Sequence, residues 1–505
     1  MLEEDALAVL NMARSIKNTF APINRTPPEV LSLIPDYCGK GEGPIKLTHV
    51  CRYWREILIS RASLWTFLNC RNPYKTRVYI ERSRGSPLEI FLTTHKYHRN
   101  AFLLTVPHID RLKALTLSGG SGHKLLKLIK HLGSSAPLLD KLEIIVQKSD
   151  VTIKNALFGG NLSSLRELRL SRIHINLPWR DLSNLTTFDF RWVPGASVTQ
   201  LLDCFEHAPL REIWLIESLP DSSDAPAERV VSLPHLRMLE ISAKVAHSIL
   251  LNHLLVPTGA FVVLQSEFND RSPPIPDHLP RSVDNLDNIS HITSIGIYSD
   301  MGIGMWFNGP SGGLYVGGEW SGSNFIPAAL DGRIFWPLNN FRISTTERLA
   351  ISQGCYPEDP GAGESGAYQI LLLVNNLRIL RLTDCIILSF VLALNPVRNA
   401  SSTVVCPELE ELVLIGYNQE EFFVHELLEM AKERAARGAK LSAISIISSQ
   451  EFISRGVLDL EDYASRVEHR VDGVLPTWDA IPDVLRKSDP AVRALIEEAD
   501  VYLCR

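Results

Sequence analysis

The sequence predicts an α/β protein in which a small helical module precedes a long, irregular array of repeated units with a parallel sheet on one side. Two observations predict this fold class. One short apolar pattern recurs ten times between Leu112 and Ile446, at a spacing typical of stacked repeats. The residues before it show the periodicity of amphipathic helices instead. At 505 residues the chain is also too long for one ordinary compact domain.

The composition is that of a well-packed protein without a strong charge bias. Hydrophobic residues make up 45% of the chain and charged residues 21%, and the net charge is −6. This balance gives no basic footprint for nucleic acid. The acidic N-terminus is unlike the basic start of a signal peptide, and the longest apolar stretch, 386–394, is too short for a membrane helix. We therefore expect no nucleic-acid or membrane partner and a cytoplasmic or nuclear location.

Periodicity and proline define the first helices. Apolar residues recur at steps of four and three within residues 1–21, which predicts an N-terminal helix. Its apolar stripe consists of Leu2, Ala6, Val9, Ala13 and Ile16. The next helix begins at a capping box formed by Thr26 and Glu29. It should end or kink at Pro35, whose ring clashes with the carbonyl four residues earlier.

A further helix and a short third element complete the module. Their apolar residues fall on one stripe at helical spacing, so one continuous helix is expected over the first group. The helix carries Leu47, Val50, Cys51, Trp54, Ile57 and Leu58, and the third element carries Leu64, Trp65 and Leu68.

Three strings within residues 22–75 resemble the F-box, in the F-box-like form common in fungal proteins. They are TPPEVLSLI, LTHVCRYWREI and SLW. The family opens on Leu-Pro-x-Glu-Ile, centres on Val-Cys-x-x-Trp and closes on Leu-Trp. The resemblance implies a three-helix module that docks on a Skp-type adaptor and, through it, on a cullin within a ubiquitin ligase. The adaptor-binding residues that it implies are Pro28, Val30, Leu31, Ile34, Leu47, Val50, Cys51, Trp54, Leu64 and Trp65.

Two other interpretations of residues 22–75 stay open. A plain three-helix cap for the array would show the same periodicity. The chain also departs from the family pattern at Thr26 and Pro35. These departures suit a degenerate F-box, which would make the protein an interaction scaffold outside any ligase.

The array, residues 76–475, is defined by the pattern apolar-x-x-apolar-x-apolar. Its copies begin at Leu112, Leu139, Leu165, Leu185, Leu210, Leu236, Ile292, Leu377, Leu409 and Leu441. The first five steps are 27, 26, 20, 25 and 26 residues, which resembles leucine-rich repeats. Each copy should form a short strand, and neighbouring strands should stack into a shared core. Segments such as Ser197–His207 read as helical connectors.

The spacing becomes irregular over residues 257–370. A strand is expected at Ala260–Leu264, a stiff Pro-rich link at 271–276 and a β-hairpin at Met305–Trp320, within the Gly-rich segment 301–323. Residues 354–367 read as a mobile loop. Alternation over 463–471 predicts a last strand, and the tail 476–505 is expected to cap the array.

No constellation of residues supports catalysis, a cofactor or a metal. Ser311 lies in a G-x-S-x-G string, but a strand-like segment follows it where a nucleophile elbow needs a helix, so a hydrolase is a remote alternative. No HExxH spacing occurs, and His95 and His98 are the nearest approach to one. The eight cysteines are scattered, as in reduced core positions. We therefore expect a binding protein, not an enzyme.

Substrate binding is expected on the strand residues that point away from the shared core. Alternation places them on one extended face. The candidate substrate-binding residues are Glu167, Arg169, Asp189, Arg191, Trp214, Glu240 and Arg381, with Glu143, Glu212 and Glu411 on the same face. Trp214 is either an exposed anchor for an unknown protein substrate or a residue covered by a helix or by the Gly-rich segment; both interpretations stay open.

Overall fold

The computed structural model shows a mixed α/β protein with mostly parallel strands. It describes residues 2–37, 43–93, 98–193, 195–266, 278–299, 302–319, 338, 340–353, 360–383, 386–399, 402–416, 421–448 and 459–471. The chain forms two compact units. Unit 1 comprises Met1–Gly195 and Asp203–Pro209, and unit 2 comprises Ala196–Leu202 and Leu210–Arg505.

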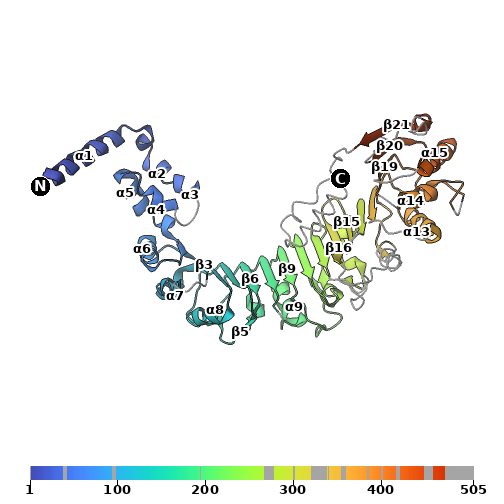
Figure 1. Cartoon of the computed structure of the whole chain (residues 1–505). Coiled ribbons are helices and arrows are strands. Elements are labelled where there is room, and N and C mark those ends of the chain that lie inside the picture. The colour runs from blue at the N-terminus through green and yellow to red at the C-terminus, as the bar shows by residue number, and fades with distance from the viewer. Residues whose placement is uncertain are drawn as a thin grey trace. The chain divides into compact units, whose positions relative to one another are not determined.

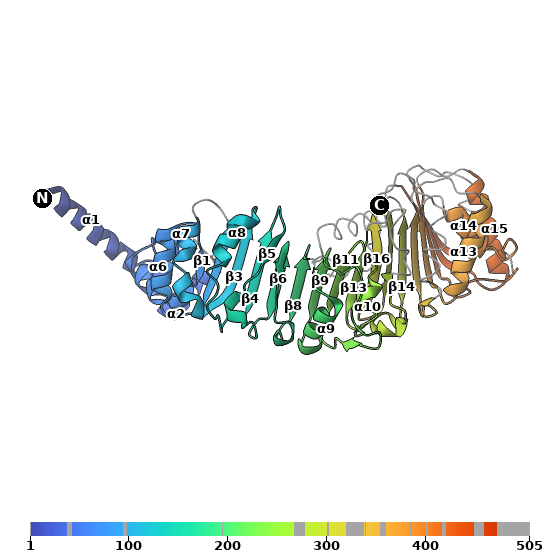
Figure 2. The ribbon, with the colours of Figure 1, turned by 90° about the horizontal axis from the view of Figure 1, so that it is seen from below.

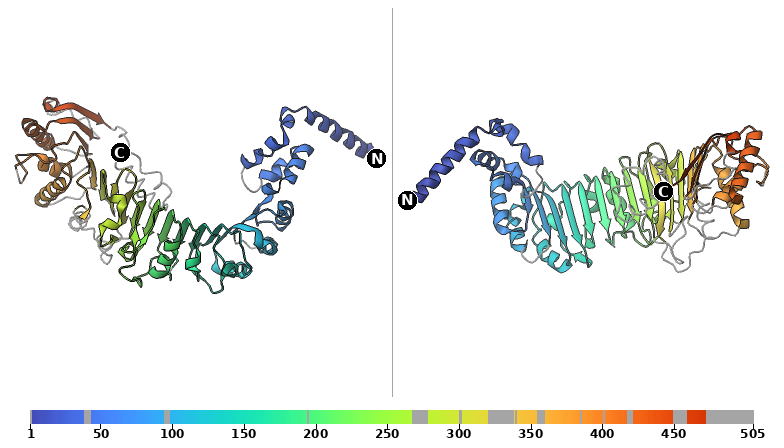
Figure 3. Two further views of the ribbon diagram at one scale, coloured as in Figure 1. Left: turned by 180° about the vertical axis from the view of Figure 1, so that it is seen from behind. Right: turned by 45° about the horizontal axis from the view of Figure 1, so that its top comes forward.

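The N-terminal part of unit 1 is helical. Its elements are α1 (Leu2–Thr19), η1 (Pro22–Arg25), α2 (Pro28–Leu31), α3 (Ile34–Tyr37), α4 (Gly43–Leu47), α5 (Arg52–Ser60) and η2 (Ala62–Trp65). The predicted N-terminal helix is present, and the described side chains from Asp5 onwards on α1 are exposed. Figure 3 shows α1 extending away from α2–α5.

Two local predictions in this module are wrong. The capping box does not form: Pro27 is the N-cap of α2, and no side chain caps that end. The single helix from Leu47 to Leu58 is divided into α4 and α5. Cys51 is fully extended and is the N-cap of α5. The Arg55 Nε donates a 3.0 Å hydrogen bond to the Thr48 carbonyl just beyond the end of α4. The predicted break at Pro35 is confirmed, since α2 stops at Leu31 and Pro35 lies in the first turn of α3.

The core of the helical module is built around two tryptophans. Trp54 is 6% exposed and its Nε1 donates to Asn24 Oδ1 at 2.8 Å. Trp65 is completely buried, and its Nε1 donates to the Leu58 carbonyl at 2.9 Å. These bonds satisfy the polar ends of two large apolar side chains. The helices are therefore held by their tryptophans.

Six parallel strands follow in unit 1, hydrogen-bonded in chain order with two short strands set aside. They are β1 (Phe67–Asn69), β2 (Leu88–Thr93), β3 (Leu112–Gly119), β4 (Lys141–Val146), β6 (Glu167–Ser171) and β8 (Thr187–Arg191). The connecting helices are α6 (Pro73–Ser83), α7 (His98–Leu103) and α8 (Gly122–Ile129), with η3 (Val106–Arg111), η4 (Leu157–Gly160) and η5 (Trp179–Asp181). Figure 1 shows α8 on one face of these strands. Since β1 begins at Phe67, the sheet starts inside the segment 22–75.

Unit 2 contains a second run of strands, in the order β9–β11–β13–β16–β15–β14–β17–β18–β19–β20–β21. Their bounds are β9 (Glu212–Ile216), β11 (Met238–Ser242), β13 (Phe261–Gln265), β14 (Ser294–Ser299), β15 (Gly302–Asn308), β16 (Gly313–Glu319), β17 (Arg348–Gln353), β18 (Ile379–Thr383), β19 (Glu411–Gly416), β20 (Leu441–Ser448) and β21 (Ala464–Val471). All ten copies of the apolar pattern therefore contain a strand.

Helices and short strands occupy the connections. The helices are α9 (Val198–His207), which matches its prediction, α10 (Ser248–Leu251), α13 (Pro360–Leu373), α14 (Ile387–Leu394) and α15 (Glu421–Ala436), with η6 (Val283–Asn285), η7 (Asp287–Ile289) and η9 (Leu460–Asp462). Figure 2 shows α13, α14 and α15 side by side. Two short parallel pairs lie in connections: β5 (Val151–Ile153) with β7 (Ile173–Ile175), and β10 (Val231–Ser232) with β12 (Leu254–Leu255).

The first apolar residue of most copies makes the same turn. Its amide donates to the carbonyl three residues earlier, which closes a tight turn just before the strand. This occurs at Leu139, Leu165, Leu185, Leu236, Leu377 and Leu409, all of which are at most 3% exposed. These copies of the pattern therefore share a backbone turn as well as a sequence pattern.

The irregular region contains a three-stranded antiparallel insertion. The predicted strand at Ala260–Leu264 is β13, and the predicted hairpin is β15 with β16, which pair antiparallel. β14 pairs antiparallel with β15 and parallel with β17, while β16 pairs parallel with β13. Ser311 lies in the hairpin turn between two strands, so the helix that a nucleophile elbow needs does not follow it.

The predicted loop at 354–367 is wrong from Pro360 onwards, where α13 begins. Glycine disfavours a helix, but Tyr368–Leu373 give α13 an apolar second half, and Leu371 is fully buried. The link 271–276 and the tail 476–505 lie outside the described residues, as do Cys38, Cys355, Cys385 and Cys504.

The predicted free cysteines are confirmed where the structure describes them. Cys51, Cys70, Cys204 and Cys406 are unbridged, and the last three are buried. Burial raises the pKa of these three thiols to about 12, so they behave as apolar core residues. Among the described residues, no helix combines the length and hydropathy needed to cross a membrane.

Candidate binding surfaces

The outward face of the unit 1 sheet carries a row of paired charges. The register of the strands places Glu143, Arg169 and Asp189 opposite one another on β4, β6 and β8. Lys141 and Glu167 form a neighbouring row on β4 and β6. Strand alternation therefore brings together the outward residues that the sequence predicted for this segment.

Ion pairs link these rows. Lys141 lies 3.0 Å from Glu167 and 3.7 Å from Glu143. Arg191 Nε lies 2.8 Å from Asp189 Oδ1. The surface is balanced in charge, because three cationic side chains face three carboxylates. The cations are Lys141, Arg169 and Arg191, and the carboxylates are Glu143, Glu167 and Asp189. Such a surface favours recognition of polar groups by geometry over attraction of a strongly charged partner.

Asp189 is the buried member of this network, at 6% exposed. Burial raises the pKa of its carboxyl, and the hydrogen bond from Arg191 opposes that rise. The sequence placed Asp189 correctly on the outward face, but the position is closed to solvent. Glu167 and Arg169 are more open, with side chains 37% and 38% exposed.

Trp214 is not an exposed anchor. It is 7% exposed and packs in a cluster with Met238, Phe261, Val263 and Tyr315, with Trp306 against it. Tyr315 and Trp306 belong to β16 and β15, within the Gly-rich segment. Of the two interpretations of Trp214, the structure supports cover by that segment.

Glycines make room for this aromatic cluster. A Cβ at Gly296 would lie 2.0 Å from the Trp306 ring, and a Cβ at Gly313 would lie 2.7 Å from Phe261. The rings therefore lie directly over backbone on neighbouring strands. Trp214 Nε1 is buried and has no hydrogen-bond partner within the described part of the chain.

The register places Trp214, Glu240 and Arg381 in a single outward row of unit 2. Six strand-to-strand steps separate Glu240 on β11 from Arg381 on β18, roughly 30 Å at the usual strand spacing. Glu240 is completely buried and Arg381 is 2% exposed. Trp214 and Glu240 lie opposite one another on neighbouring strands, whereas Arg381 shares their face but does not meet them in one site.

The helical module divides the implied adaptor-binding residues into two groups. Leu31, Trp54, Leu64 and Trp65 are at most 9% exposed and belong to its core. Val30 is 49% exposed and Val50 is 54% exposed. Pro28 is exposed, and Ile34, Leu47 and Cys51 are half-buried. The six exposed or half-buried residues are accessible to a partner. The four buried residues hold together the helices that carry them.

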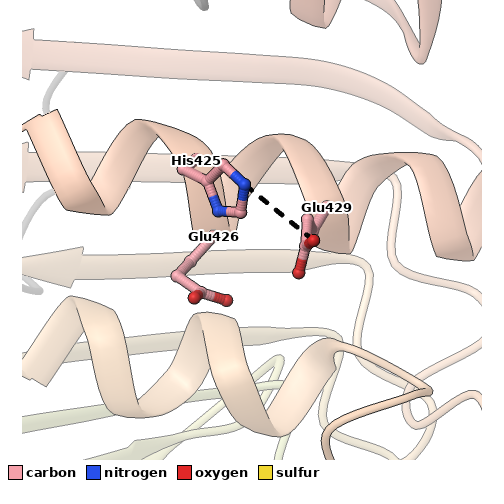
Figure 4. Close-up of side chains that lie close together, drawn as sticks. All are labelled: His425, Glu426 and Glu429. Carbon is pink, nitrogen blue, oxygen red and sulfur yellow. Dashed lines mark ion pairs between the residues drawn. The ribbon is translucent and has the colours of Figure 1, made fainter.

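One cluster of candidate ligands was missed in the sequence. His425, Glu426 and Glu429 place one potential ligand atom each within 4.8 Å of one another, on adjoining turns of α15 (Figure 4). The string His-Glu-Leu-Leu-Glu sets His425 and Glu429 at the i and i+4 spacing of one helix face. A search restricted to pairs of histidines does not find it. His95, of the pair noted in the sequence, lies outside the described residues.

We expect unit 2 to lose stability in acid because His247 is buried. It is 1% exposed, and its ring centroid lies 4.5 Å from that of His278. Burial, and then the neighbouring His278, hold the pKa of His247 well below 6.5. The unfolded chain takes up a proton as the pH falls through 6.5 and the folded chain does not, so the stabilisation present above that pH is lost below it. The free energy of unfolding should fall by about 1 kcal/mol from about pH 7.5 to about pH 5.5.

Denaturant unfolding followed by circular dichroism at several pH values measures this change. The His247→Gln variant should show a flatter dependence on pH than the unchanged protein. The exposed His235→Gln variant is the matched control and should keep the full dependence. Equal slopes in all three proteins would contradict the assignment to His247.

Three surfaces thus carry the candidate residues: the charged rows of unit 1, the aromatic row of unit 2 and the exposed residues of the helical module. No family model matches the chain, and no curated protein matches its sequence.

Proposed function

We propose that this protein is a substrate-recognition adaptor of a Skp–cullin–F-box type ubiquitin ligase. In this proposal the helical module is an F-box-like domain that binds a Skp-type adaptor. The strand-containing units form an irregular leucine-rich-repeat-like solenoid that holds a protein substrate. Ubiquitin transfer belongs to other subunits, and this chain acts by raising the local concentration of substrate.

The solenoid interpretation is supported by the repeated turn and by the parallel registers. Each repeat contributes one strand with fully buried apolar residues, and a single repeat cannot cover that apolar face alone. The outward rows are then the natural place for substrate, because a stack of such strands presents them as one surface. Glu167, Arg169 and Arg191 are its accessible members in unit 1.

The observation that carries the adaptor interpretation is the exposed apolar surface of the module. Val30, Leu33 and Val50 are each about half exposed, at 49%, 51% and 54%, although the two tryptophans of the same module are buried. Apolar residues left on a small helical module suit a protein–protein contact. Val30 and Val50 are also positions of the F-box resemblance.

The test is binding of a purified Skp-type adaptor to the full-length chain. Replacement of Val30 or Val50 by Glu places a charge in the proposed contact, where it loses its water on binding. Each replacement should weaken binding at least about tenfold, which corresponds to about 1.4 kcal/mol. Biolayer interferometry on immobilised protein measures this change, and circular dichroism checks that the variants fold.

Leu138→Glu is the matched control. Leu138 is 49% exposed, as Val30 is, but lies outside the helical module, so binding should be unchanged. Trp54→Ala is a poorer test because its loss would report collapse of the module. If the unchanged protein binds no Skp-type adaptor, the scaffold interpretation with a degenerate F-box replaces this proposal.

A further inference from the structure

The missed cluster on α15 has a donor set suited to a transition metal. An imidazole nitrogen and two carboxylate oxygens are ligands that zinc accepts, and three protein ligands leave a fourth position for water or another group. His425 Nε2 lies 3.9 Å from Glu429 Oε1. Figure 4 shows these two side chains adjacent on the helix with Glu426 beside them. Small side-chain adjustments bring such atoms to one ion.

Glu426 supplies an independent indication. It is 3% exposed, yet its Oε2 atom has no hydrogen-bond partner within the described part of the chain. A buried carboxylate oxygen without a partner is costly, and binding of a cation is one way to offset that cost. The cluster is therefore more than a group of exposed acids.

Arg398 arranges the two carboxylates. Its Nη2 lies 3.4 Å from Glu426 Oε1 and 3.6 Å from Glu429 Oε2. One oxygen of each carboxylate thus faces the guanidinium. The other oxygen of Glu426 is unpartnered, and the other oxygen of Glu429 faces His425. Outer residues that hold one carboxylate oxygen in this way orient the other towards a metal.

The charges also favour a cation. Two carboxylates against one guanidinium leave a net charge of minus one when His425 is neutral. Zn²⁺ matches this site better than Mg²⁺ or Ca²⁺ because those ions prefer sites made only of oxygen. We propose that His425, Glu426 and Glu429 form a zinc-binding site on α15, with Arg398 as its positioning residue.

The probe is Zn²⁺ alone, added to the full-length chain after removal of metal with a chelator. Competition with a chromophoric chelator measures affinity, and the absorption of bound Co²⁺ reports nitrogen and oxygen ligation. We expect one equivalent of Zn²⁺ to bind at the site. His425→Ala and Glu429→Gln should each weaken that binding at least about tenfold.

Glu433→Gln is the matched control. Glu433 lies one turn further along α15 and pairs with Arg437 at 3.6 Å, so its replacement should leave zinc affinity unchanged. Subtraction of the His425→Ala titration removes weak sites elsewhere on the chain. If the unchanged protein, His425→Ala and Glu429→Gln bind the same zinc with the same affinity, the site does not exist and the cluster is an ion-pair network. Displacement of zinc by excess Mg²⁺ would overturn the assigned metal class.

Discussion

Replacement of Trp65 by alanine should lower the free energy of unfolding of unit 1 by about 3–5 kcal/mol, the usual cost of truncating a buried tryptophan. Trp65 is completely buried. Its ring packs edge-on against Tyr79 with centroids 5.0 Å apart, and the Arg82 guanidinium lies 4.4 Å from its centre. The change leaves a cavity and also leaves the Leu58 carbonyl without its donor.

Hydrogen–deuterium exchange of the full-length variant locates the effect. Protection should fall in α5, α6 and β1, while β18–β20 in unit 2 should keep theirs. Trp192→Ala is the control, since Trp192 is 38% exposed and its loss should cost little. Unchanged protection around Trp65 would show that this side chain does not hold the module together.

Replacement of Arg434 by alanine should destabilise unit 2 by about 3 kcal/mol. Arg434 lies on α15 and is completely buried. Its Nη1 donates to the Val405 carbonyl at 2.7 Å and its Nη2 to the Cys406 carbonyl at 2.8 Å. Burial lowers the pKa of this guanidinium to about 10, so it stays charged at neutral pH. Alanine removes two charge-assisted hydrogen bonds and opens a cavity. It also removes the cost of keeping a charge buried, but the two losses are larger than this gain.

Urea unfolding monitored by circular dichroism measures this loss. Arg434→Lys keeps the charge but lacks the fork that reaches both carbonyls, so it should fall between the alanine variant and the unchanged protein. Arg437→Ala removes an exposed arginine just beyond the C-terminal end of α15, and we expect a change below about 0.5 kcal/mol. An alanine variant at position 434 as stable as the Arg437 variant would contradict the structural role.

Strand positions follow from the sequence wherever the spacing is complete, and the exceptions have local causes. The pattern does not predict β2, because only one residue separates Leu88 from Ile90 where the pattern has two. The register with β3 shifts at Leu88 for the same reason. β17 was missed because Thr346, fully buried, occupies the place of the leading leucine. A search that allowed a buried threonine or a one-residue deletion would find both.

Periodicity predicts the face of a residue better than its burial or its neighbours. Glu240 and Arg381 were correctly placed on the outward face, but what covers them depends on contacts far away in the chain. Likewise, Ile292 opens a copy of the pattern, yet its strand pairs with β15 and β17 and not with β13. The HELLE string on α15 was visible in the sequence, but its relation to Arg398 depends on tertiary structure.

The insertion in unit 2 bears on the order in which the chain can assemble during synthesis. Within unit 2, β11 pairs with β9 and β13 pairs with β11, so this part of the sheet can grow as the chain lengthens. The second edge of β13 stays unpaired until β16 has been synthesised. β16 ends at Glu319, more than fifty residues after the end of β13. An open edge that waits for a distant segment is a site for pairing with other chains. Aggregation of nascent protein should therefore be greatest in chains that end between residues 265 and 313.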